Sequence, residues 1–198
     1  MKLPKSHPIP SLVIFIILGS LPARGIPFTL DFGGLQNNEQ VLNFYNGGTG
    51  SLGSGPGPNF GITFSSSLGA VSAVPPYGPN IVGQLNGSSA IMDVSGGFNL
   101  LSFYYEASDN SGSVVLWSGL NGTGVMLADI PLAASATWNA AGTGFGPIAE
   151  SAVFSGTPGI RFDQITDVAL VTPEPSSILL FATGLISLIP ACRRRLVG

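Results

Sequence analysis

The segment between Ile26 and Pro175 holds few side chains able to do acid–base, nucleophilic or metal chemistry, because it lacks histidine, cysteine and lysine. That inventory excludes Ser-His-Asp triads, cysteine nucleophiles, Schiff-base lysines and histidine-based zinc or iron sites. It also contains no phosphate-binding P-loop and no dinucleotide fingerprint. What remains is oxygen chemistry: paired carboxylates for glycoside hydrolysis, or an all-oxygen site for a hard cation such as calcium.

Five carboxylates are the candidates for these two chemistries. Glu106 and Glu150 could form a glycosidase pair, although two glutamates in a glycine-rich β protein are more often solvated surface residues. Asp31, Asp163 and Asp167 fall on the expected first and last strands, which often lie close together in a sandwich. Surface charge is the favoured interpretation of these aspartates, and a calcium site is the alternative. We therefore assign no catalytic residue, name no cofactor apart from that calcium, and expect a protein that is not an enzyme.

Aromatic side chains offer a binding site of a different kind, because their faces can stack on sugar rings. The candidates are Tyr104, Tyr105, Trp117 and Trp138. Core packing is the alternative for each of them. Two functional classes stay open: a non-catalytic surface or matrix protein that associates with polysaccharide, with or without calcium, and a carboxylate-dependent glycoside hydrolase.

The charge between Ile26 and Pro175 is strongly negative. Ten acidic residues face the single basic residue Arg161, which gives this stretch a net charge of −9. Phosphate backbones would be repelled, so nucleic acid is excluded as a partner. The same charge resists self-association and favours a monomer.

The elements that must position these residues are expected to be short strands. Apolar, β-branched and aromatic runs recur every 8–14 residues, separated by Gly, Pro, Asn and Ser clusters, which predicts an all-β sandwich or barrel. The expected strands are residues 28–32, 41–45, 60–64, 68–74, 81–85, 90–94, 98–107, 113–118, 124–132, 151–154, 159–165 and 167–171.

Two connections between these strands are rich in turn-forming residues. The glycine-rich residues 46–61 predict a long loop, with a disordered linker as the alternative. The run Asp109-Asn110-Ser111-Gly112 predicts a hairpin turn between residues 98–107 and 113–118.

Residues 1–25 have the layout of a secretory signal peptide. Lys2 and Lys5 form a positive start, residues 12–18 form an apolar run that extends through Leu21, and small residues precede a cleavage point after Gly25. A permanent N-terminal anchor is the alternative, but the apolar run is well short of the roughly 20 residues that a membrane span needs. We therefore expect the secretion machinery and signal peptidase to be partners.

A second apolar segment lies near the C-terminus. Residues 176–192 are uncharged and mostly apolar, and as a helix they would reach roughly 25 Å across a hydrocarbon core of roughly 30 Å. Arg193, Arg194 and Arg195 follow directly and favour a cytoplasmic C-terminus, with the body of the protein outside. A buried core helix is the alternative, but it would lack an amphipathic polar face.

The order of features in this tail resembles a PEP-CTERM sorting domain. Pro173, Glu174 and Pro175 form the motif, the apolar segment follows, and the arginine cluster comes last. The resemblance implies that an exosortase recognises the motif and removes the tail. The protein would then be anchored only transiently in the inner membrane before reaching the cell surface or exterior, commonly in Gram-negative bacteria that make extracellular polysaccharide.

The body is similar, more weakly, to the jelly-roll bodies that such proteins carry, through residues 29–32, 60–64 and 160–165. The resemblance implies a jelly-roll-like antiparallel β-sandwich. The expected organisation is thus a signal peptide (1–25), a β-sandwich body (26–171) and a sorting tail with one transmembrane helix (172–198).

Overall fold

The computed structural model describes residues 27–108 and 111–169. The predicted signal peptide, the sorting motif, the apolar tail segment and the arginine cluster all lie outside these ranges, so they stay predictions. Within the described ranges, no helix has the length and apolar character to cross a membrane.

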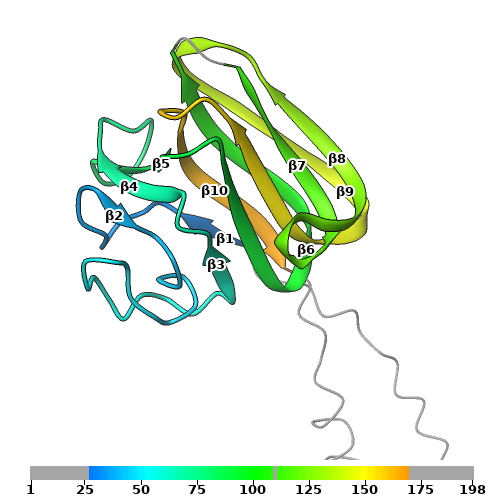
Figure 1. The fold of residues 1–198 in the computed structure, drawn as a ribbon, viewed down its shortest axis with the longest axis horizontal. Coiled ribbons are helices and arrows are strands. Elements are labelled where there is room, and N and C mark those ends of the chain that lie inside the picture. Colours follow the sequence, from blue (N-terminus) through cyan, green and yellow to red (C-terminus); the bar gives the residue numbers. More distant parts are fainter. Residues whose placement is uncertain (1–26, 109–110, 170–198) are drawn as a thin grey trace, which may run out of the picture.

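Ten antiparallel strands and one short 3-10 turn make up the described structure, which confirms the all-β antiparallel prediction (Figure 1). Hydrogen bonds join eight strands in the order β2-β4-β5-β10-β6-β9-β7-β8, while β1 pairs with β10 and β3 with β6. The elements are β1 (Pro27–Leu30), β2 (Glu39–Gln40), β3 (Ile62–Phe64), β4 (Leu68–Ser72), β5 (Ile81–Leu85), β6 (Ser89–Ala107), β7 (Gly112–Gly119), η1 (Leu120–Gly122), β8 (Thr123–Leu132), β9 (Ser135–Gly156) and β10 (Arg161–Ala169).

The two longest strands, β6 and β9, bend and serve both layers of a sandwich. Residues 89–93 of β6 pair with residues 151–155 of β9, and the register then breaks before residues 100–105 pair with 139–144. Gly96 and Gly97 sit at this break with φ of 89° and 73°, a region that favours glycine. A register break with positive-φ glycines bends a strand, so each long strand passes from one layer to the other.

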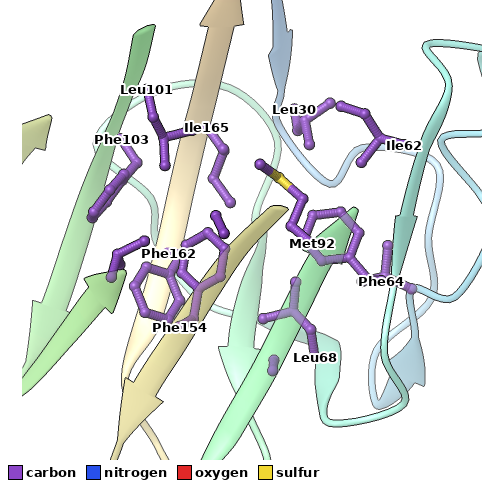
Figure 2. Packing of buried hydrophobic residues seen from close by; sticks show 14 of the residues in the cluster. Leu30, Ile62, Phe64, Leu68, Met92, Leu101, Phe103, Phe154, Phe162 and Ile165 are labelled. Carbon is purple, nitrogen blue, oxygen red and sulfur yellow. The ribbon is translucent and has the colours of Figure 1, made fainter. Parts of the chain in front are cut away.

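Aromatic contacts across the interior show that the two layers face each other. The rings of Phe103 in β6 and Phe154 in β9 lie 6.0 Å apart. The two residues are not register partners, because Phe103 pairs with Ala141 and Phe154 pairs with Ala90. Phe154 also meets Phe162 of β10 at 4.9 Å. Figure 2 shows these rings converging with Leu101 and Ile165 in one buried cluster. The sandwich-like prediction is therefore confirmed.

The predicted hairpin at residues 109–112 is wrong. Among the described residues, β6 and β7 do not pair with each other, and both pair with β9: Ser89 and Ser113 are each registered with Ser155. Ala107 ends β6 in one layer, and Gly112 begins β7 in the other. The turn residues predicted a reversal but not the layer in which the next strand would lie.

The glycine-rich residues 46–61 form an ordered loop, so the loop prediction is confirmed and the linker alternative is wrong. Backbone hydrogen bonds close the loop on itself, from Gly57 N to Gly48 O at 2.9 Å and from Gly47 N to Pro58 O at 3.1 Å. The loop packs beside β2, where Ser51 N donates to Gln40 O at 3.0 Å, and its last residue reaches β6, where Ser95 N donates to Gly61 O at 2.8 Å.

Candidate functional site

Three aromatic side chains gather on the outer face of the layer formed by β10, the second half of β6 and the first half of β9. Because Phe103 and Tyr105 are buried, the alternation of β6 turns Tyr104 outward. Tyr104 is registered with Ala140, so Trp138, two residues earlier on β9, faces the same way. Tyr77 comes from the 73–80 loop between β4 and β5. We call Tyr77, Tyr104 and Trp138 the aromatic face.

The 73–80 loop is held against this face by two contacts. The rings of Tyr77 and Tyr104 meet edge to face with centroids 5.4 Å apart. The indole N–H of Trp138 donates to the carbonyl of Val74 at 3.1 Å. The side chain of Tyr77 nevertheless stays 59% exposed, while Tyr104 and Trp138 are half-buried. The neighbouring Tyr77 hydroxyl raises the pKa of Tyr104.

A shallow groove of about 520 Å³ continues from the aromatic face along β6 and β9. Its floor is open because the glycines of β9 leave space there, with Gly142 registered with Ser102 and Gly144 with Leu100. The groove is lined by Leu100, Leu101, Ser102, Ala140, Ala141, Gly142, Thr143 and Gly144. It is broad and open to solvent, and so suits a polymer that extends beyond the protein.

An ion pair borders the same surface. Arg161 of β10 donates to Glu106 of β6 at 3.0 Å, and the two residues are register partners. The structure does not bring Glu106 and Glu150 together. Glu150 is exposed and lies next to Ala149, which is the register partner of Phe98. Phe98 is eight residues from Glu106 on β6, so Glu106 and the position of Glu150 are about 26 Å apart along the strand. Glycosidase carboxylates lie within roughly 5–10 Å of each other, so this pair does not have that geometry.

The predicted sugar-stacking residues divide between the surface and the core. Tyr104 and Trp138 lie together on the aromatic face. Tyr105 is buried against Phe103 with ring centroids 6.4 Å apart, so core packing is correct for it. Trp117 lies on β7, in the other layer, registered with Ser151 of β9. Sequence reasoning missed Tyr77, whose only signal is an aromatic residue inside a proline- and glycine-rich loop.

Two of the three predicted calcium ligands come together. Asp163 is fully buried, and neither of its carboxylate oxygens has a hydrogen-bond partner among the described residues. Burial raises the pKa of Asp163 to about 7, the Asp31 charge adds to the rise, and the nearby Gln164 amides oppose it without reaching good hydrogen-bond geometry. Asp31 lies near this part of β10, because a Cβ placed on Gly78 would be 3.9 Å from Asp31 and 3.3 Å from the side chain of Gln164.

Asp167 stands apart from that pair. It is buried further along β10, between Phe28 of β1 and Leu101 of β6. Burial alone raises the pKa of Asp167 to about 7, with no effect from Asp31 or Asp163. Within residues 27–108 and 111–169, no three His, Cys, Asp or Glu side chains lie close enough together to hold a metal ion.

No protein-family model matches the chain, and no curated protein matches its sequence. Among solved structures, it is similar to a family 6 carbohydrate-binding module at 17% identity and a TM-score of 0.39, over 56% of this chain and 94% of that one. It is also similar to the module CsCBM6-3 of Clostridium stercorarium, solved with cellobiose, at 11% identity and a TM-score of 0.39, over 53% of this chain and 83% of that one. A third match is the family 29 module CBM29_1 of Piromyces equi, at 9% identity and a TM-score of 0.36, over 55% of this chain and 91% of that one. At TM-scores below 0.5, these likenesses assign no function to the chain.

Proposed function

We propose that the protein is an exported, non-catalytic module that binds extracellular polysaccharide through the aromatic face. The observation that carries this proposal is the placement of Tyr77, Tyr104 and Trp138 on one outer face, beside an open groove. Aromatic rings present a large, rigid apolar surface with a polar edge, which suits the apolar faces and hydroxyl rims of sugars. An open groove admits a chain that enters and leaves on both sides.

The charge of the body narrows the ligand to a neutral polysaccharide. Arg161 is the only Lys or Arg among the described residues, and it is paired with Glu106. A polymer carrying carboxylates or sulfates would find no free cation on this surface and would be repelled by the net negative charge. Ring stacking and hydrogen bonds to neutral hydroxyl groups are the interactions that remain.

The test is binding of the full-length chain to immobilised neutral and uronic-acid polysaccharides. Replacing Tyr77 or Trp138 by alanine should weaken binding to the neutral polymer about tenfold each, which corresponds to about 1.4 kcal/mol. The matched control is Trp117→Ala, which removes an aromatic residue from the other layer and should leave binding unchanged. Equal losses in Trp117→Ala and Trp138→Ala, or preferred binding to the uronic-acid polymer, would contradict the proposal.

Export and sorting form the second part of the proposal. Its support is the order of sequence features at the two ends, including Pro173-Glu174-Pro175 and the arginine cluster Arg193–Arg195. Exosortase is the expected partner, and the inner membrane holds the chain only until the tail is removed. Intact-mass measurement of the released protein tests this, because a mature form that retains Arg193–Arg195 would contradict tail removal.

The jelly-roll strand order belongs to the same proposal. Its support is that the first strand, β1, pairs with the last, β10, as first and last strands often do in a sandwich.

A further inference from the structure

The strongest unexplained feature of the body is the unpartnered carboxylate of Asp163. Its side chain is fully buried, and both oxygens lack a hydrogen-bond partner in the described chain. A buried carboxylate without hydrogen bonds or a counter-charge is costly, so such a group is ordinarily paired, protonated or bound to a metal. Asp163 therefore points to a ligand that its own neighbours do not supply.

A second carboxylate lies close to it and increases the negative charge. Asp31 acts on Asp163 by charge repulsion, and both act in the same way on the buried phenol of Tyr45. One Asp31 oxygen accepts a hydrogen bond from the Gly33 amide at 3.0 Å. Within residues 27–108 and 111–169 the only Lys or Arg is Arg161, which is paired with Glu106. Two neighbouring carboxylates thus lack a cation.

The 73–80 loop lies against Asp31 and against Gln164, the neighbour of Asp163. A Cβ placed on Gly33 would lie 3.2 Å both from Asp31 Oδ1 and from Pro79. A Cβ on Gly78 would lie 3.3 Å from the Gln164 side-chain amide and 3.9 Å from Asp31. Asp31, Gln164 and the 73–80 loop therefore lie together. Carboxylate, side-chain amide and backbone carbonyl oxygens are the ligands that calcium takes.

We infer that Asp31 and Asp163 bind one calcium ion beneath the 73–80 loop. The cation neutralises the two carboxylates and fixes the loop against β1 and β10. Calcium fits better than magnesium, because calcium accepts an irregular shell of oxygen ligands, whereas magnesium demands strict octahedral geometry and retains its water. Because the loop carries Tyr77, calcium also orders one edge of the aromatic face; this consequence alone rests on the proposed function.

The test is a calcium titration of the full-length chain after treatment with a chelator, followed by calorimetry and thermal denaturation. We expect one ion per chain and a rise in Tm of about 5–10 °C at a hundredfold excess over the Kd. Asp31→Asn and Asp163→Asn should each abolish both effects. The matched control is Asp167→Asn, which removes a buried carboxylate from the same strand and should keep calcium binding.

Folding of the variants is checked by the same denaturation curves. Without calcium, Asp163→Asn should be at least as stable as the wild type, because it removes an uncompensated buried charge. Absence of calcium binding, binding retained in both variants, or an equal effect of magnesium overturns the inference. These readouts use no polysaccharide, so failure of the calcium site and failure of the proposed function are distinguishable.

Discussion

Glu39 shows how a buried carboxylate is satisfied by backbone amides in this protein. Its side-chain oxygens accept hydrogen bonds from the amides of Gln36 and Leu52, each at 2.8 Å, and of Ser54 at 3.1 Å. Burial would raise the pKa of Glu39, but the hydrogen bonds from Ser54, Gln36 and Leu52 outweigh burial and hold it below its usual value. The close approach also requires glycine at position 50, where a Cβ would collide with the carboxylate. Glu39 therefore anchors the glycine-rich loop as an anion.

Replacing Glu39 by glutamine should lower the free energy of unfolding by about 2–3 kcal/mol, because charged hydrogen bonds are lost and an amide N–H₂ faces backbone donors. The loop at residues 46–61 should also become sensitive to limited proteolysis. Urea denaturation measures the first effect. Glu150→Gln, at an exposed glutamate of β9, is the control and should change neither quantity. A loss of stability no greater than that of the control would show that Glu39 does not anchor the loop.

Asp167 is the opposite case, because it is buried without a hydrogen-bond partner in the described chain and its pKa is raised from 3.8 to about 7. The folded state therefore binds the proton more tightly than the unfolded state does. The contribution of Asp167 to stability is greatest below about pH 4, falls as the pH rises toward 7, and is constant above that.

The pH dependence of Asp167→Asn tests this linkage. The variant should match the wild type near pH 4 and exceed it by a few kcal/mol above pH 7, since each pKa unit is worth about 1.4 kcal/mol. Urea denaturation of both proteins from pH 4 to 8 measures the difference, and pH effects of all other groups cancel. A difference in unfolding free energy between the two proteins that does not change with pH would contradict the raised pKa of Asp167.

At the scale of elements, sequence patterns predict the strands that turn residues border on both sides. They miss strands that form only because a neighbouring strand pairs with them. Residues 81–85 were predicted as a strand and form β5, because turn residues border them on both sides. The first half of β9 was missed, because Ser135–Phe145 is rich in Ala and Gly and has little intrinsic strand preference. Pairing with β6 makes it a strand. The strand expected at 41–45 is a turn, with Leu42 at φ 49°, although its apolar side chains still reach the core.

For the candidate sites, the sequence predicts several of the residues but not how the strands bring them together. Pairing of the first and last strands was expected and brings Asp31 and Asp163 together, but Gln164, with φ of 50° beside a register shift in β10, sets Asp167 apart. Tyr104 and Trp138 were named from residue type alone. They share a face because of the register between β6 and β9. The small residues of the first half of β9 form no alternating pattern that would specify this register.

Gly144 of β9 tests the groove as an element of the binding surface. A Cβ there meets no atom within 4 Å, so Gly144→Leu should fill the groove without disturbing the fold. We expect binding to neutral polysaccharide to fall at least fivefold while Tm changes little. Gly146→Leu is the matched control, because Gly146 is equally open on the same strand but does not line the groove. Equal effects of the two variants would contradict a role for the groove.

At the scale of the whole molecule, the described chain begins and ends at one end of the sandwich. Pro27 of β1 is the register partner of Val168 of β10, and Figure 1 shows these two strands side by side. Arg161, beside the aromatic face, lies seven residues back along β10, or about 23 Å from that end. A chain held through its tail would therefore present the aromatic face away from the point of attachment.

Oriented immobilisation tests this arrangement, because Cys192 in the tail is the only cysteine of the chain. Full-length protein captured through biotin on Cys192 should bind neutral polysaccharide at full capacity. In a Cys192→Ser background, capture through Thr137→Cys, at an exposed position next to Trp138, should reduce capacity at least tenfold, because the support then covers the aromatic face. Capture through Val125→Cys, exposed on β8, controls for labelling and should retain binding. Full capacity after capture at Thr137→Cys would place the binding surface elsewhere, and a loss on capture through Cys192 would show that the site faces the tail.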